Sequence, residues 1–129
     1  MQLPIEHPTT IESLQLHLVQ PKELRLSGTV STKTAQEELS RHLSQFHDHI
    51  VSEQYPSVTV DVRTLNFVNS SVIRVFVTWI ARAEQGGYKL VFLTEHTVTW
   101  HRLSFPVLKS LAPVTVEIQE RNSSGKPST

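Results

Sequence analysis

The hydrophobic residues of this 129-residue chain recur with two different spacings, one typical of strands and one typical of helices, and these spacings alternate along the sequence. From residue 10 to residue 20 apolar and polar side chains alternate, which is the period of a half-buried strand. From residue 35 to residue 50 apolar side chains recur every three or four positions, which is the period of an amphipathic helix. The two spacings keep alternating to residue 119. This pattern predicts a domain that layers helices on a sheet, because both kinds of apolar face must be buried.

Turn and capping residues divide the pattern into elements. Strands are predicted over residues 10–20, 23–27, 58–65, 89–93 and 114–119, and helices over residues 35–50, 70–85 and 99–111. Pro21 separates the first two strands into a hairpin. The first helix is capped by Thr34 or by Ser31. Pro106 either kinks the last helix or lies in the first turn of a shorter helix capped by Ser104.

The element order β-β-α-β-α-β-α-β predicts an α/β fold with a mixed, mostly parallel sheet of four or five strands and about three helices. Residues 1–119 form one domain, and the polar residues 120–129 are expected to be a disordered tail. The continuous apolar run at 89–93 predicts a strand covered on both faces, and the last strand is expected at an edge. Connections 28–34, 66–71 and 94–99 then share the carboxyl edge of the sheet, where function is expected.

Two helices have apolar faces that can be assigned from spacing. In the helix over residues 70–85, one face holds Ile73, Phe76, Val77 and Ile80. This face is widened by Val72, Val75 and Trp79, so the helix is predicted to be mostly buried. In the last helix, Leu103, Val107 and Leu111 lie four residues apart, so they share a face.

Composition excludes several classes of function. Lys plus Arg equals Asp plus Glu at 12 each, so the formal net charge gives no attraction for nucleic acid or an anionic membrane surface. Zero Cys excludes a thiol nucleophile and Cys-ligated metal centres. No basic segment followed by an apolar run opens the chain, and the longest apolar stretch is interrupted by Arg74 and Arg82. We expect a cytoplasmic protein without membrane insertion and without a cofactor.

The most informative segment is the turn over residues 66–69 with the two hydroxyls that follow it. Asn69, Ser70 or Ser71 can cap the helix by accepting a hydrogen bond from a backbone N–H of its first turn. The same geometry suits a modification site. A phosphate on Ser70 would lie at the positive end of the helix, facing free N–H donors.

This segment resembles the STAS domain, typified by the anti-sigma factor antagonists, whose motif joins the third strand to the second helix. The residues in register with this motif are Asp61, Phe67, Asn69, Ser70, Ser71, Val72 and Ile73. The resemblance covers roughly residues 12–119, and the Asn-Ser-Ser variant is similar to bacterial STAS-like regulators. It implies a phosphoprotein that transduces a signal by partner switching rather than an enzyme.

The resemblance also implies partners and a site. Ser70, with Ser71 as second choice, would be phosphorylated by a serine kinase that is itself the anti-sigma-factor-like binding partner, and a PP2C-type phosphatase would reset it. The implied partner-binding residues are Asn69, Ser70, Ser71, Val72, Thr94, His96 and Trp100. The alternative is a constitutive STAS accessory subunit of a larger complex, such as a lipid transporter, without phosphorylation.

Two positions depart from the family motif, and one aromatic has two possible roles. Asn69 stands where many members have Asp, and Val72 stands where most have Gly. Val72 therefore places a β-branched side chain beside Ser70, where it is expected to narrow the approach of a kinase. Trp100 serves either as a core residue under the last helix or as an anchor at the edge of the partner surface.

The sequence does not favour a metal site or a hydrolase site. His42, His47 and His49 crowd one helix, but their spacing of five and two residues does not place them on one face, so no metal site is predicted. A hydrolase built on Ser70, His96 or His101, and Asp61 would need a nucleophile elbow. The chain holds no Gly-x-Ser-x-Gly sequence.

Overall fold

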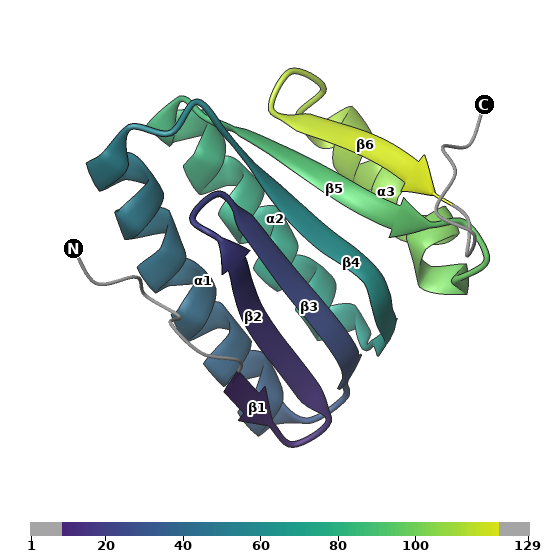
Figure 1. Cartoon of the computed structure of the whole chain (residues 1–129). Helices are drawn as coiled ribbons and strands as arrows, with labels where there is room; N and C mark the ends of the chain where they lie inside the picture. Colours follow the sequence, from purple (N-terminus) through teal and green to yellow (C-terminus); the bar gives the residue numbers. More distant parts are fainter. Residues whose placement is uncertain (1–8, 122–129) are drawn as a thin grey trace.

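The computed structural model describes residues 9–121, which form one six-stranded sheet and three helices (Figure 1). The elements are β1 (Thr9–Ile11), β2 (Leu14–Gln20), β3 (Glu23–Val30), α1 (Lys33–Glu53), β4 (Ser57–Val68), α2 (Ser70–Gly86), β5 (Lys89–Glu95), α3 (Thr99–Leu111) and β6 (Val116–Arg121). The α/β prediction is confirmed. The sheet has one strand more than predicted, because residues 10–20 form two strands separated by a turn in which Glu12 has a φ of +55°.

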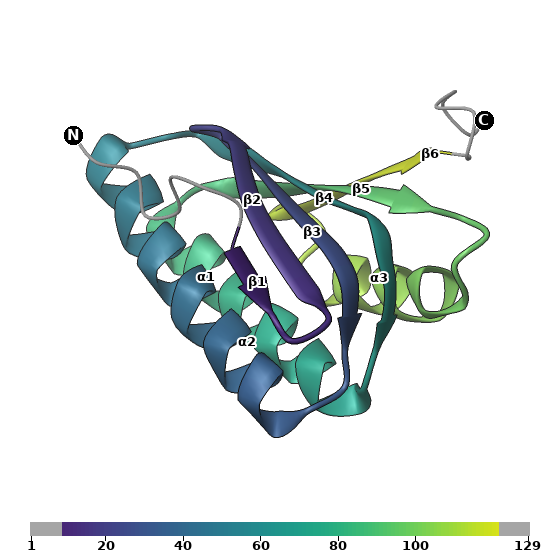
Figure 2. The ribbon, with the colours of Figure 1, turned by 60° about the horizontal axis from the view of Figure 1, so that its bottom comes forward.

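The strands lie in the sheet in the order of the sequence, from β1 to β6. β1, β2 and β3 pair antiparallel, and β3, β4, β5 and β6 pair parallel. Each helix therefore crosses over in the same direction, and right-handed crossovers place all three helices on one face (Figure 2). Within residues 9–121, no helix covers the other face of the sheet, which is called the open face below.

The core lies between the sheet and the helices, and strand side chains alternate between it and the open face. On β5, Leu90 and Phe92 are fully buried under the helices, whereas Val91 and Leu93 are half-buried on the opposite side. The prediction that this strand is covered on both faces was therefore wrong. Because the helices cover only one side, a strand at the centre of the sheet needs apolar residues at alternate positions only.

Several predicted boundaries shift because tertiary contacts extend or cap the elements. Thr32 caps α1, rather than Thr34 or Ser31, by accepting from the backbone N–H of Ala35 at 3.1 Å. β4 continues to Val68 and absorbs most of the predicted turn at 66–69. β6, at the sheet edge as predicted, runs to Arg121, beyond the predicted start of the tail at residue 120, and residues 122–129 lie outside the described part.

The buried faces of α2 and α3 differ from the ones predicted from spacing. Val77 of α2 is exposed, whereas Val72 and Trp79, which the sequence also places on the apolar face, are buried as predicted. α3 begins at Thr99 and contains Pro106, which settles the alternative left open by the sequence. Its apolar stripe faces outward: Leu103, Val107 and Leu111 are 68%, 56% and 59% exposed. The face that packs inward is aromatic, with Trp100 and Phe105 buried.

No helix within residues 9–121 is long and apolar enough to cross a membrane.

The contrast between two glycines tests the packing at the carboxyl end of β3. Both have positive φ, +96° for Gly28 and +78° for Gly87. A Cβ on Gly28 would overlap the carbonyl oxygen of Ser13, whereas a Cβ on Gly87 would meet nothing within 4 Å. We expect Gly87→Ala to lower the free energy of unfolding by about 1 kcal/mol, from backbone strain alone. Gly28→Ala should cost about 2–5 kcal/mol, because overpacking adds to that strain. Urea denaturation of both variants measures the difference, and equal losses would contradict the contact with Ser13.

Candidate functional site

The start of α2 presents a hydroxyl at the carboxyl edge of the sheet. Asn69 is the N-cap, and its side-chain oxygen accepts from the backbone N–H of Val72 at 3.2 Å. Its own backbone N–H donates to the carbonyl oxygen of Val30 at the end of β3, at 3.1 Å. Ser70, the first helical residue, is exposed, and its hydroxyl makes no hydrogen bond within residues 9–121. The capping role therefore belongs to Asn69, and the hydroxyl of Ser70 is left available.

The residues around Ser70 divide between surface and core. Phe67, three positions earlier on β4, is half-exposed, and Ser71 is half-buried. Val72 is fully buried in the core, so the prediction that it contributes to the partner surface and narrows access to Ser70 was wrong. The reason is helical geometry: two residues along the helix turn the side chain from the solvent face to the sheet.

The start of α1 lies at the same edge, because β3 and β4 are parallel and each leads directly into a helix (Figure 2). The turn between β1 and β2 reaches this edge too. The carboxylate of Glu12 accepts from the hydroxyl of Thr32 at 2.8 Å, and Thr32 caps α1. The backbone N–H of Thr29 donates to the carbonyl oxygen of Ser13 at 3.0 Å. On the β3 side of Ser70, the carboxyl edge of the sheet is therefore stabilised by backbone and capping hydrogen bonds.

On the β5 side of Ser70, β4 separates from β5, and the first turn of α3 fills the gap between these two strands. The pairing of β4 with β5 ends at Asp61 and Leu93, whereas β4 stays paired with β3 to Val68. The indole Nε1 of Trp100 donates to the carbonyl oxygen of Leu65 at 2.7 Å. Nδ1 of His101 accepts a hydrogen bond from the backbone N–H of Glu95 at 3.0 Å. Nε2 of His101 lies 3.2 Å from the same oxygen of Leu65.

Trp100 and His101 therefore join two strands that no longer pair directly. Because Nδ1 of His101 accepts a hydrogen bond, the proton of the neutral ring is on Nε2, which donates to Leu65. Trp100 is only 9% exposed and stacks on Phe76, with ring centroids 6.1 Å apart. Of the two roles considered for it, the core role is the one found, and it does not form an exposed anchor. His101 was considered only as a catalytic base. Its bridging role depends on strands distant in sequence, so no sequence signal revealed it.

Thr94 and His96 belong to a different part of the edge. Thr94 is 3% exposed and lines a cavity bounded by β5, α3 and β6. His96 is exposed, with Nδ1 3.8 Å from a carboxylate oxygen of Glu95. Within the described residues no hydrogen bond or ion pair joins Ser70 to either of them. The predicted partner-binding residues therefore form two groups, of which only Asn69, Ser70 and Ser71 surround the candidate hydroxyl.

Asp61 lies on the open face of β4 and is held by two arginines. Arg63 makes a bidentate contact, with Nε 3.0 Å and Nη2 2.9 Å from the two carboxylate oxygens, and Nε of Arg25 lies 3.5 Å away. Burial alone would raise the pKa of Asp61. The hydrogen bonds and the positive charges of the two arginines outweigh burial and hold that pKa below its usual value. Asp61 is thus ionised and held by the two arginines. Within residues 9–121, no histidine joins it to Ser70 in a hydrogen-bonded triad.

The histidines of α1 are distributed among separate contacts. Nδ1 of His42 donates to the carbonyl oxygen of Glu38 at 2.8 Å, and Nδ1 of His47 lies 2.7 Å from the hydroxyl of Tyr88. His49 packs its ring edge-on against Tyr55. Within residues 9–121 no three His, Asp or Glu side chains are grouped so that they could hold a metal ion.

No protein-family model matches the chain, and no curated protein is significantly similar to it. The resemblance to STAS domains therefore rests on the motif around Ser70 and on the order of the elements.

The bridging role of His101 predicts a dependence of stability on pH. Burial lowers the pKa of His101, against the opposing effect of its hydrogen bonds to Leu65 and Glu95. A lowered pKa means that the folded state favours the neutral ring. This stabilisation is complete above the unfolded pKa of about 6.5 and is lost as the pH falls below it. We expect the free energy of unfolding, measured with urea, to decline from about pH 7 to about pH 5.

Two variants separate the histidines that contribute to this decline. Burial also lowers the pKa of His47. His101→Gln should remove more of the slope than His47→Gln, because His101 is the more deeply buried of the two. An unchanged slope in His101→Gln would show that its ring titrates normally in the folded protein.

The pairing of Asp61 predicts a second, more acidic transition. Because its pKa is lowered, the pairing stabilises the protein above the ordinary carboxyl pKa, and this contribution is lost as the pH falls below about 4. Asp61→Asn should lower the free energy of unfolding at neutral pH by about 1–3 kcal/mol, and the difference from wild type should shrink in acid. Glu38→Gln, which breaks an exposed pair with Arg41, is the matched control and should change stability little. A constant deficit of Asp61→Asn at all pH values would contradict the assignment.

Proposed function

We propose that this protein is a phosphorylation-switchable interaction regulator of the STAS type, acting in the cytoplasm, with Ser70 as its switch. The observation that carries the proposal is the exposed hydroxyl of Ser70, which makes no hydrogen bond within residues 9–121, at the first position of α2. A hydroxyl in this place is accessible to a kinase, and neighbouring groups do not depend on it for capping.

The start of α2 is suited to hold a phosphate. The first backbone N–H groups of a helix lack partners within it, and the helix dipole favours negative charge there. The first turn of α2 contains no acidic side chain. Asn69 caps the helix without a charge, so a phosphate of about −1.5 to −2 on Ser70 would meet no carboxylate from the cap. Modification would therefore leave the helix folded and change only the surface.

That surface change is the switch. In the unmodified protein, Ser70 and the half-exposed ring of Phe67 offer a small, uncharged contact area. In the proposed cycle, the Ser70 oxygen attacks the γ-phosphorus of ATP on the partner kinase, ADP leaves, and the hydroxyl proton passes to a base of the kinase. The partner would then have to desolvate a dianion to bind, which is unfavourable without a facing cation. A PP2C-type phosphatase would hydrolyse the phosphoserine and restore binding.

A second candidate function, a constitutive accessory subunit of a larger complex such as a lipid transporter, is favoured by a different observation. Leu103, Val107 and Leu111 form an exposed apolar stripe on α3, which a permanent partner could cover. The three side chains of this stripe are exposed, whereas Trp100 and Phe105 of the same helix are buried. Binding through it would not depend on the state of Ser70.

Substitutions at Ser70 test the switch. We expect a candidate serine kinase with ATP to phosphorylate wild type and Ser71→Ala but not Ser70→Ala, as read by mass spectrometry. Ser70→Asp should weaken binding of the kinase, measured by calorimetry, by about tenfold or more, which corresponds to about 1.4 kcal/mol. Phosphate found only on Ser71 would contradict the assignment.

Stability and a stripe variant serve as controls for this test. Ser70→Asp should stabilise the fold by about 0.5 kcal/mol, whereas Gln85→Asp at the opposite end of α2 should not, so lost binding cannot be attributed to unfolding. Val107→Lys on α3 should leave kinase binding intact. If Val107→Lys abolishes partner binding and Ser70→Asp does not, the constitutive function is the correct one.

A further inference from the structure

Arg74 is an exposed cation of α2 that lies one helical turn after Ser70. Its guanidinium forms no ion pair and no hydrogen bond with any residue in the range 9–121. A cation of α1 at the same spacing from an acidic side chain is paired, because Nζ of Lys33 lies 3.9 Å from Oε1 of Glu37, four residues later. The sequence around Arg74 explains why its own charge is left without such a partner.

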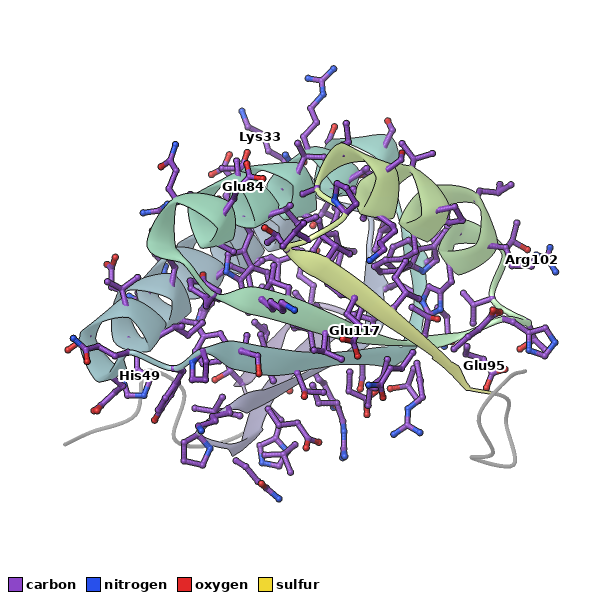
Figure 3. All side chains as sticks on the ribbon, turned by 90° about the horizontal axis from the view of Figure 1, so that it is seen from above. Lys33, His49, Glu84, Glu95, Arg102 and Glu117 are labelled. Carbon is purple, nitrogen blue, oxygen red and sulfur yellow. The ribbon has the colours of Figure 1, made fainter. Side chains whose placement is uncertain are left out.

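The neighbours of Arg74 on the helix surface carry no carboxylate. Residues three and four positions apart along a helix lie next to each other on its surface. For Arg74 these neighbours are Ser70, Ser71, Val77 and Thr78. The acidic residue of α2, Glu84, lies near the C-terminal end of the helix (Figure 3), and α3 contains no Asp or Glu. An anion that suits Arg74 lies on its N-terminal side, where two serines could acquire a negative charge by phosphorylation.

We propose that Arg74 is the positioning residue of the Ser70 switch, and that its guanidinium pairs with the phosphate once Ser70 is phosphorylated. This inference rests on the proposed phosphorylation of Ser70. An anion four residues before a cation is the favourable orientation of a helical ion pair, because it also agrees with the helix dipole. A guanidinium can donate two parallel N–H groups to phosphate oxygens. Ser70 and Arg74 are both exposed, whereas Ser71 is half-buried, so the phosphate of Ser70 reaches the guanidinium without leaving the solvent surface.

The ion pair changes what a partner meets at this surface. In the unmodified protein, a partner that docks over Ser70 covers a neutral hydroxyl. After phosphorylation, the phosphate and the guanidinium of Arg74 would be held together on the first two turns of α2. The partner would then have to remove water from two charged groups, which costs more free energy than covering a hydroxyl. Arg74 thus makes the phosphate a fixed part of the surface, rather than a group that turns away from an approaching partner.

Phosphorus NMR of the full chain, with phosphoserine introduced at position 70 during translation, tests the ion pair without a kinase. A nearby cation favours the dianion of the phosphate, whose ordinary pKa is about 6. We expect this pKa to be about 0.3 lower in the phosphorylated wild type than in phosphorylated Arg74→Gln, which corresponds to an ion pair of about 0.4 kcal/mol. Arg74→Lys keeps the charge and should retain most of the lowering. The difference should shrink in 1 M NaCl, because salt screens exposed charges.

Arg82→Gln is the matched control, because it removes an arginine from the same helix about three turns after Ser70. The guanidinium of Arg82 donates to the hydroxyl of Ser44 at 2.8 Å, so it has a partner of its own. This variant should leave the pKa of the phosphate unchanged. An equal pKa in wild type and Arg74→Gln, or an equal change in Arg74→Gln and Arg82→Gln, would overturn the inference. Either result leaves the proposed function standing, which fails instead if a kinase does not modify Ser70.

Discussion

The carbonyl oxygen of Leu65 is the point on which the carboxyl edge of this sheet depends. β4 leaves β5 after Asp61, so its backbone beyond that residue has lost one neighbouring strand. Trp100 and His101 take the place of that strand, because each donates a side-chain hydrogen bond to the carbonyl oxygen of Leu65. His101 also accepts a hydrogen bond from the backbone N–H of Glu95. A buried carbonyl without these donors would lower stability, because a polar group removed from water needs a partner. The end of β4 and the start of α2 are therefore positioned by a helix that comes later in the chain.

This arrangement separates two regions that the order of the loops would place together. On one side, Asn69 caps α2 and leaves the hydroxyl of Ser70 exposed. On the other side, Thr94 faces a cavity whose walls come from β5, α3 and β6. Trp100 and His101 lie at the boundary, since their contacts reach both β4 and β5. The hydroxyl of Ser70 and the cavity beside Thr94 therefore lie in separate parts of the edge, and Ser70 does not line that cavity.

The one-sided sheet has a consequence for charge as well as for packing. With all helices on one face, the open face of β4 needs polar residues, and Asp61 occupies its centre between Arg25 and Arg63. The pairing keeps the carboxylate ionised although little of it is exposed, because the cations outweigh the cost of burial. Asp61 belongs to the motif that resembles STAS domains. Its contacts here assign it to supporting β4 rather than to any reaction at Ser70.

The sequence by itself determined the order of the elements, the start of α2 at Ser70 and the stop at Gly86–Gly87, because period and capping are local properties of neighbouring residues. The antiparallel start followed by parallel crossovers came from the same pattern, since connection lengths restrict the topology. Only the tertiary structure decided which apolar face each helix buries. Leu103, Val107 and Leu111 have perfect helical spacing and yet point outward, because the aromatic face of α3 is needed to fill the gap between β4 and β5. The bridge that Trp100 and His101 form between Leu65 and Glu95 likewise depends on contacts between residues far apart in the chain, which local patterns do not encode.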